Sequence, residues 1–233
     1  MYDVKKFLGR GCYSLVYEVE RRGDGGENGQ RFAFKRTFFY RSGAIQCAIR
    51  EWNVFKRLQE AEITSPFLPT LYHSFMIGQT SSVLVIDLST GKDLFDILKT
   101  FGRMNEYSVL FYVAEIMCAL EKLHQLRIVH MDLKPENVTL LPSGHLMLSD
   151  FDRSNDLLSK NLMASEWISF GGTDGFMAPE VVSNRTVSTV SDVWGLGMIT
   201  AELACGALSP SERNASEESV FRRFYLKNLS EPL

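Results

Sequence analysis

The chain has few of the features that mark secreted, membrane-spanning or strongly charged proteins. Only four of its 233 residues are cysteine, and their spacing fits neither a metal site nor a disulfide framework: Cys12, Cys47, Cys118 and Cys205. No apolar run approaches the roughly 18 residues that cross a bilayer. The first residues also lack the apolar core of a signal peptide. We therefore expect a reduced, intracellular protein, cytoplasmic or nuclear, with no membrane span.

Charge is also nearly balanced. The chain has 25 Lys and Arg against 28 Asp and Glu, a net charge of −3, which gives no general attraction to nucleic acid or to an anionic membrane. Hydrophobic residues make up 45% of the chain and charged residues 23%, an ordinary globular mixture for one or two compact domains. Specific motifs must therefore carry any functional argument.

Two polar segments near the middle of the chain give the strongest chemical signal. Residues 130–137 read His-Met-Asp-Leu-Lys-Pro-Glu-Asn, and a short apolar run at 146–148 leads into Asp150. A hairpin would bring these segments together. Asp132 could then take a proton from a hydroxyl, while Asn137 and Asp150 are oxygen ligands suited to Mg²⁺. Any one of these residues alone is more often an ordinary loop residue, but the spacing of the set favours a site.

The octet at 130–137, the pair Asp150-Phe151 and the triplet Ala178-Pro179-Glu180 occur in an order that resembles the eukaryotic protein kinases. The resemblance runs from about Tyr2 to about Gly206 and is strongest to serine/threonine kinases of the AGC group. It implies an α+β, two-lobed fold: a small, mainly antiparallel sheet with one helix, then a mainly helical lobe. The implied boundaries are 1–86 for the first lobe, 87–91 for the hinge and 92–233 for a partial second lobe. The implied cofactors are ATP and Mg²⁺.

In the first lobe, the resemblance assigns residues to the nucleotide. Lys35 on a strand would hold the α- and β-phosphates, paired with Glu51 on a helix over residues 44–58. The glycine-rich loop, the adenine contacts and the hinge would include Gly9, Gly11, Ser14, Val16, Ala33, Ile86, Asp87 and Ser89. Periodicity places an apolar face on the helix that contains Glu51: Ile45, Ala48, Ile49, Trp52, Phe55 and Leu58.

In the second lobe, the resemblance assigns catalysis and substrate contacts. Asp132 would be the base, Lys134 would contact the transferring phosphate, and Asn137 and Asp150 would hold Mg²⁺. Thr139 would form an unusually polar floor under adenine. Three acids match those that bind ribose or basic substrate residues, Asp93, Glu136 and Glu202, so we expect a protein substrate with basic residues N-terminal to its acceptor. Structural or regulatory roles fall to Ser169 as a phosphosite, Thr173 as a hydrogen-bond partner of Asp132, Glu180, and Asp192 beneath the loop around His130.

The sequence departs from the family pattern at four points. Ser14 replaces the third loop glycine, and Asp152 replaces the glycine after Asp-Phe, which removes freedom at φ > 0 and restricts flipping of Phe151. Met131 replaces the arginine that would clamp a phosphate on Ser169, so we expect little dependence on phosphorylation there. The chain ends at Leu233, before the arginine that normally pairs with Glu180, which predicts no partner for that acid. A fragment, a truncated gene model or an incomplete lobe would each explain this ending.

Two functions of different classes remain open from the sequence. The first is ATP-dependent phosphoryl transfer to Ser or Thr of proteins. The second is a pseudokinase or scaffold that binds partners, and perhaps nucleotide, without efficient transfer; Met131 and Asp152 favour it. A kinase of small molecules is disfavoured because residues 172–180 resemble a peptide-docking platform. The sequence does not define the physiological substrate or the oligomeric state.

Overall fold

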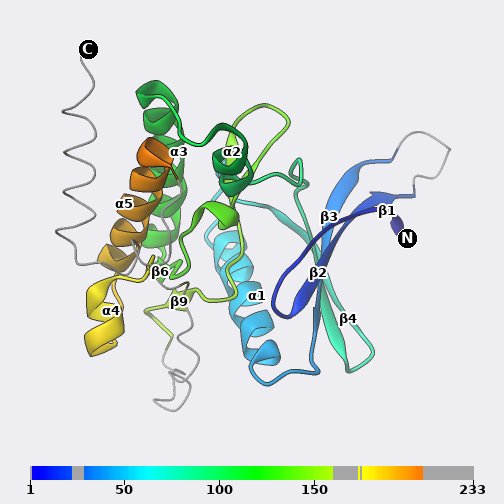
Figure 1. The fold of residues 1–233 in the computed structure, drawn as a ribbon. Coiled ribbons are helices and arrows are strands. Elements are labelled where there is room, and N and C mark those ends of the chain that lie inside the picture. The colour runs from blue at the N-terminus through cyan, green and yellow to red at the C-terminus, as the bar shows by residue number, and fades with distance from the viewer. Residues whose placement is uncertain (1, 23–28, 160–172, 174, 207–233) are drawn as a thin grey trace, which may run out of the picture.

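The computed structural model describes residues 2–22, 29–159, 173 and 175–206, which form a sheet-rich half followed by a helical half (Figure 1). The sheet is antiparallel, with strand order β1-β2-β3-β5-β4. Its strands are β1 (Tyr2–Arg10), β2 (Ser14–Arg21), β3 (Arg31–Phe38), β4 (Leu71–Ile77) and β5 (Ser81–Ile86). The expected α+β, two-lobed kinase fold is confirmed.

Strand register gathers the expected nucleotide residues of the sheet on one face. Ala33 and Lys35 alternate along β3 and so share a face. Val16 on β2 lies opposite Lys35, and Ile86 on β5 lies opposite Ala33. Because residues directly opposite each other in an antiparallel pair project to the same side, all four lie on that face.

A single helix, α1 (Ala44–Glu60), accompanies the sheet. The helix was expected, but its predicted apolar face was wrong in part, since Ile45, Ile49 and Trp52 are 47%, 52% and 39% exposed. The buried face is rotated and consists of Ala44, Cys47, Glu51, Val54, Phe55 and Leu58. The rotated face still buries apolar side chains, and it also places Glu51 toward Lys35.

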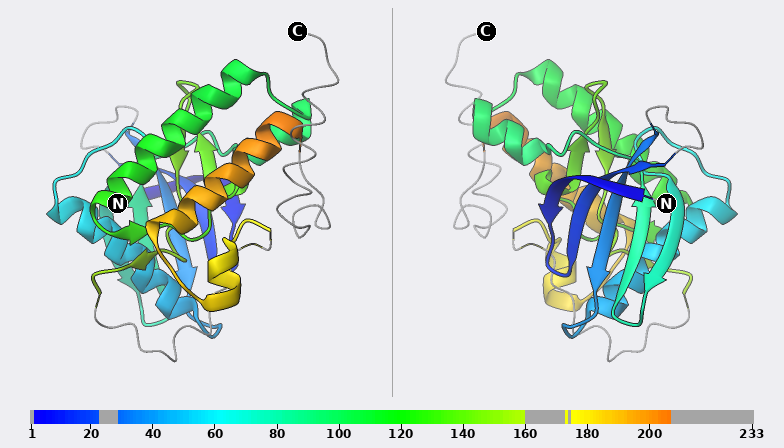
Figure 2. Two further views of the ribbon diagram at one scale, coloured as in Figure 1. Left: turned by 90° about the vertical axis from the view of Figure 1, so that its left-hand side faces the viewer. Right: turned by 90° about the vertical axis from the view of Figure 1, so that its right-hand side faces the viewer.

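The second half is built from helices around two small strand pairs. Its elements are α2 (Leu94–Phe101), α3 (Glu106–Gln125), β6 (Ile128–Val129), η1 (Pro135–Asn137), β7 (Val138–Leu140), β8 (Leu146–Leu148), β9 (Asn155–Asp156), α4 (Pro179–Asn184) and α5 (Thr189–Cys205). Figure 2 shows α3 and α5 lying alongside each other. Among the described residues, none of the helices has the length and apolar character needed to cross a bilayer.

The core joins both halves. From α3 it takes Val109, Ile116, Leu120 and Leu123, and from β8 it takes Leu146 and Leu148. β7 pairs with β8 in a hairpin, and β6 pairs with β9. These two pairings carry the polar segments 130–137 and 149–154 to one place.

Candidate active site

A buried lysine joins three distant segments of the chain. The Nζ of Lys35 lies 2.7 Å from Oε1 of Glu51 on α1 and 2.6 Å from Oδ1 of Asp150. Burial alone would lower the pKa of Lys35, but the carboxylates of Asp150 and Glu51 outweigh it and hold that pKa above its ordinary value. Burial raises the pKa of Glu51, whereas Lys35 overcomes the effect of burial at Asp150 and keeps its pKa low. The lysine is therefore charged and fixed in direction.

The carboxylate of Asp132 is held from several sides. Its Oδ2 accepts hydrogen bonds from Nζ of Lys134 at 2.7 Å and Nδ2 of Asn137 at 3.0 Å. Its Oδ1 accepts from the Thr173 hydroxyl at 3.1 Å, the contact expected for this threonine, and from the Thr173 backbone N–H at 3.2 Å. Lys134 also donates to the Thr173 hydroxyl at 2.8 Å. Asp132 is buried, and these four hydrogen bonds fill the about four acceptor sites of a carboxylate, so an incoming hydroxyl would have to replace one of the donors.

The side-chain oxygens of Asn137 and Asp150 fit a Mg²⁺ ion that is also bound by phosphates. The Nδ2 of Asn137 donates to both the backbone carbonyl and the carboxylate of Asp132, which leaves its amide oxygen as a possible ligand. Asp150 uses Oδ1 on Lys35 and remains partly exposed. Among the described residues, no group of three or more His, Cys, Asp or Glu is placed to hold a metal by itself. Two oxygen ligands suit an ion whose remaining ligands are water and substrate phosphates.

Two residues of this centre have strained backbones. Met131 has φ of 71° and Asp150 has φ of 70°, in the left-handed region that non-glycine residues seldom adopt. Such angles cluster at functional sites and persist only where the surroundings hold them. At these two positions, the backbone turns to bring Asp132 and Asp150 toward Lys35.

Asp192 at the start of α5 holds the segment around His130, as expected. Its carboxylate, 1% exposed, accepts from the backbone N–H groups of His130 and Met131 at 2.8 and 2.9 Å, and it lies 2.8 Å from Nε2 of His124. The His130 ring contacts the Ser149 carbonyl and packs on Phe151, so this histidine is structural. Phe151 packs edge-on against Phe55 of α1, 5.5 Å between ring centroids.

The face expected to hold adenine has an apolar side and a polar floor. Val16, Ala33 and Ile86 line the sheet side, and the Thr139 hydroxyl beneath them donates to the Met147 carbonyl at 3.1 Å, which satisfies the donor of this polar floor. The carboxylate of Asp87 accepts from the Thr70 N–H and the Tyr72 hydroxyl. The Asp87 side chain is thus held against β4, and Ser89, whose hydroxyl accepts from the Gly91 N–H, lies two residues further along the hinge.

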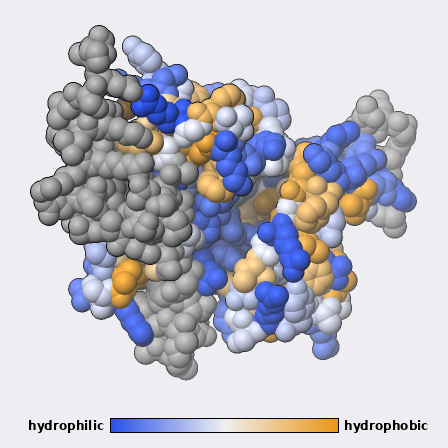
Figure 3. All heavy atoms as spheres, in the orientation of Figure 1, coloured by the Kyte–Doolittle hydropathy of each residue, from blue (hydrophilic) through white to orange (hydrophobic). Residues whose placement is uncertain are grey.

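The glycine-rich loop lies at the β1–β2 turn. Gly9 pairs with Val16, and the Gly11 N–H donates to the Ser14 carbonyl at 2.9 Å. The Ser14 side chain is buried and packs under Gly11: a Cβ on Gly11 would lie 2.7 Å from Oγ of Ser14. In Figure 3 the surface between the sheet and the helices is hollowed, with hydrophilic residues along its helical side.

Comparison with known proteins agrees with this geometry. The family description "Protein kinase domain" matches residues 2–229. This chain belongs to the protein kinase domain family. It is 34% identical to human ribosomal protein S6 kinase alpha-2 over 207 residues, which cover 89% of the chain and 27% of that protein. It is 34% identical to mouse ribosomal protein S6 kinase alpha-6 over 216 residues, 93% of the chain and 27% of that protein.

A third relative comes from yeast. The serine/threonine-protein kinase SCH9 of Saccharomyces cerevisiae is 34% identical over 209 residues, 88% of the chain and 24% of that protein. The expected likeness to serine/threonine kinases of the AGC group is confirmed by these matches. The kinase domain spans about a quarter of the length of the curated relatives it matches.

The three acids expected at the substrate differ in accessibility. Asp93 caps α2 by accepting from the Asp96 N–H at 2.8 Å, and burial raises its pKa. Glu136 lies beside it on η1 and is half-buried. Glu202 has no exposed surface, so the expectation that it meets a basic residue of the substrate does not hold for this conformation.

Two further expectations have different outcomes. Glu180 was expected to have no partner, and this was wrong: its Oε1 accepts from the Ser191 hydroxyl of α5 at 3.1 Å, and Ser191 also belongs to the capping box that starts this helix. Ser169 lies outside the described residues.

Asp152, in place of the usual glycine, has an ordinary negative φ and sits among charges. Burial first, and then Asp150, raise the pKa of Asp152 to about 7.

Sequence reasoning missed the ion pair between Arg57 on α1 and Asp156 on β9, because its members are 99 residues apart and carry no local signal.

Proposed function

We propose that this kinase domain transfers the γ-phosphoryl group of ATP to serine or threonine hydroxyls of proteins. The observation that carries the proposal is the convergence of Glu51 and Asp150 on Lys35, at 2.7 and 2.6 Å. A lysine fixed between two carboxylates is a point charge aimed at one place. Kinases use such a lysine to hold the phosphates of ATP.

Asp132 would orient the acceptor hydroxyl and receive its proton. Its carboxylate is anchored by Asn137 and Thr173, which fixes its direction, and the acceptor hydroxyl would replace Lys134 on Oδ2. Positioned base catalysis of this kind contributes typically 10²–10⁴-fold. Lys134, now 2.7 Å from Asp132, would reach the transferring phosphate and partly neutralise it.

Asn137 and Asp150 would hold Mg²⁺ with ATP. When bound, Mg²⁺ supplies positive charge to the phosphate oxygens. The chain's part is to supply one amide oxygen and one carboxylate from the two arms of the β7–β8 hairpin, with the carboxylate of Asp150 in contact with Lys35. Val16, Ala33, Ile86 and Thr139 would bound the base, with hinge backbone at Asp87 and Ser89.

The experiment measures transfer and binding separately. The purified chain should transfer radiolabelled phosphate to a generic basic protein in the presence of Mg²⁺, and Asp132→Asn should abolish the transfer. ATP should raise the melting temperature of both proteins only when Mg²⁺ is present. A parent no more active than Asp132→Asn would overturn the proposal.

The alternative, a scaffold that binds nucleotide or partners, rests on Met131 and Asp152. Mg²⁺-dependent stabilisation by ATP without any transfer would favour it. We also propose that the substrate has Arg N-terminal to its acceptor, because Asp93 and Glu136 lie together beside the proposed site. An arrayed peptide library with no such preference would remove that part.

We further propose that activity depends little on phosphorylation at Ser169. Met131, in place of the usual arginine, supplies no charge to hold a phosphate on Ser169. Turnover by Ser169→Ala close to that of the parent supports this, and its collapse would contradict it.

A further inference from the structure

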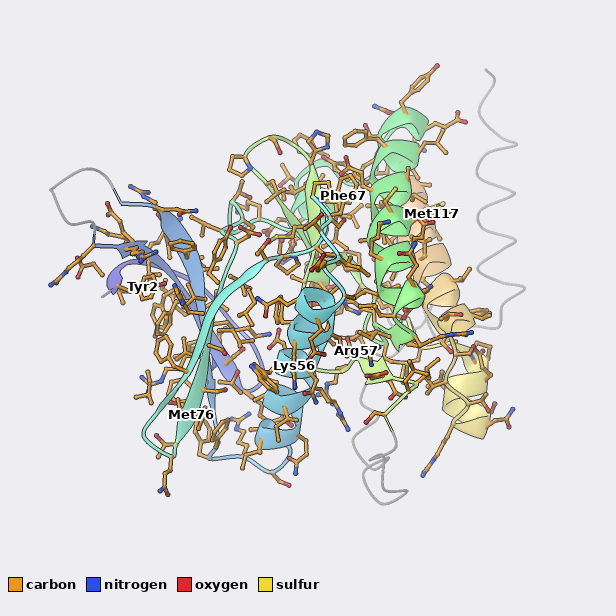
Figure 4. All side chains as sticks on the ribbon, turned by 180° about the vertical axis from the view of Figure 1, so that it is seen from behind. Tyr2, Lys56, Arg57, Phe67, Met76 and Met117 are labelled. Carbon is orange, nitrogen blue, oxygen red and sulfur yellow. The ribbon has the colours of Figure 1, made fainter. Side chains whose placement is uncertain are left out.

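The last turn of α1 contains an arginine that reaches across to the helical half. Nη1 of Arg57 lies 2.6 Å from Oδ2 of Asp156 on β9, and its Nη2 donates to the Leu126 carbonyl at 3.1 Å. The two side chains are 28% and 20% exposed. Figure 4 labels Arg57 between α1 and the helical half, beside Lys56. One guanidinium thus joins α1 to two separate segments.

Both acceptors are themselves held in place. Leu126 ends α3, where backbone carbonyls lack partners within the helix, so Arg57 satisfies one of them. The other oxygen of Asp156 accepts from the Leu158 N–H at 3.0 Å, which fixes the carboxylate. β9 pairs with β6 through Asp156 and Ile128. The guanidinium therefore contacts an ordered surface.

This surface is directly connected to the proposed catalytic residues. β6 leads into His130 and Asp132, and β9 follows Asp150 and Phe151. On α1, Arg57 is six residues after Glu51, about 9 Å along the helix axis at 1.5 Å per residue. A change in the position of this end of α1 would move Glu51 relative to Lys35.

We propose that Arg57 is a positioning residue: by bridging Asp156 and the Leu126 carbonyl it holds α1 where Glu51 meets Lys35. This proposal rests on the proposed function and concerns how the active arrangement is maintained. The Arg57 contact would hold α1 in place in a chain whose residue 131 is methionine rather than arginine. The ion pair between Arg57 and Asp156 would then hold α1 in place of a phosphate on the chain.

A simpler explanation is that Arg57 only complements the helix dipole, since cations are favourable near a helix C-terminus. That role would need neither the 2.6 Å contact nor the burial of both partners. The other end of α1 begins at Gly43, which has φ of 86° and no side chain to cap the helix. Ile45 and Ile49 in the first two turns are exposed. The first turn of α1 therefore has no side-chain cap to anchor it, whereas its last turn has Arg57.

The test compares Arg57→Ala and Asp156→Ala with Lys56→Ala. Lys56 lies on the same turn, in an exposed pair with Glu60, and serves as the matched control. We expect kcat to fall roughly tenfold to a hundredfold in the first two variants, the effect of a small misplacement of a catalytic group. Lys56→Ala should stay within about twofold of the parent. The KM for the protein substrate should change little in all three.

A double-mutant cycle separates positioning from general stability. If Arg57 acts through Glu51, then Arg57→Ala added to Glu51→Gln should lower kcat by less than about twofold further. A full additional loss in that background would overturn the proposal, as would an unchanged kcat in Arg57→Ala alone. Should the alanine variant not fold, Arg57→Gln keeps most of the side-chain length and removes the charge.

Amide hydrogen exchange tests the contact independently of activity. In the nucleotide-free protein, Arg57→Ala should speed exchange along α1 and in β6 and β9 together. Exchange faster only in the last turn of α1 would contradict the proposal. If the parent is inactive but Arg57→Ala still speeds exchange in α1, β6 and β9 together, the proposed function is wrong and the positioning role of Arg57 is still supported.

Discussion

The two loops that flank the proposed phosphate site are built in opposite ways. The loop at 130–137 is held by buried and part-buried hydrogen bonds: its N–H groups donate to Asp192, and the hydroxyls of Ser154 and Thr173 donate to it. The glycine-rich loop between β1 and β2 exposes Arg10, Gly11 and Cys12, and its contacts are mostly backbone ones. The base and the metal ligands need fixed directions, whereas a loop over phosphates must admit and release the nucleotide.

The difference is also one of how contacts are made. Asp192, which holds the loop at 130–137, is a buried carboxylate joined to three groups from two segments of the chain. The glycine-rich loop is fixed at its rim, where the Phe38 N–H donates to the Tyr13 carbonyl, and by the small side chain of Ser14. Changes in the first loop should therefore cost stability and activity together, and changes in the second should mainly alter nucleotide affinity.

The largest effect should follow Asp192→Ala. It would leave the N–H groups of His130 and Met131 buried without their acceptor, and we expect the free energy of unfolding to fall by about 3–5 kcal/mol. Chemical denaturation measures this. Asp87→Ala is the control, because Asp87 likewise accepts from backbone and side-chain donors, but from one of each and near solvent. It should cost about 1 kcal/mol or less. Equal losses of unfolding free energy in Asp192→Ala and Asp87→Ala would contradict the view that burial makes the loop at 130–137 sensitive.

A smaller effect, confined to nucleotide affinity, should follow Gly11→Ala. The added methyl group would lie 2.7 Å from Oγ of Ser14, so either the Ser14 side chain or the loop must shift. We expect the KM for ATP to rise several-fold, with the free energy of unfolding changed by less than about 1 kcal/mol. Adding Ser14→Gly should restore part of the affinity. Gly9→Ala, whose methyl would meet no atom within 4 Å, should raise KM less. No rescue by Ser14→Gly would show that Ser14 does not set the loop's shape.

The smallest effect involves no change in sequence. Burial raises the pKa of Cys47, on the buried face of α1, to about 11. Since the thiolate is the reactive form, only about 0.1% of Cys47 is reactive at pH 8, and labelling stays slow until the pH nears 11. Iodoacetamide should therefore modify the exposed Cys12 of the glycine-rich loop long before Cys47, as mass spectrometry would show. Mg²⁺-ATP should protect Cys12. Equal rates at Cys12 and Cys47 would contradict the burial of α1.

The resemblance to a known family predicted the fold, and it predicted the contact of Lys35 with Glu51 that the structure shows. Sequence reasoning failed where orientation depends on partners far along the chain. Helical periodicity predicted α1 but placed Ile45, Ile49 and Trp52 on its buried face. A hydrophobic stripe does not include the ion pair of Glu51 with Lys35, which lies on the face that is actually buried. The bond from Ser191 to Glu180 and the bridge from Arg57 to Asp156 likewise depend on tertiary packing.

The left-handed backbone at Met131 and Asp150 limits which side chains an engineer could install there. Asparagine and glycine adopt such angles readily, while valine, isoleucine and threonine resist them because of branching at Cβ. Asp150→Asn therefore isolates the loss of charge, with the chain path kept. A β-branched replacement at either position would confuse chemistry with a distorted main chain, so an inactive variant of that kind would say little about metal binding.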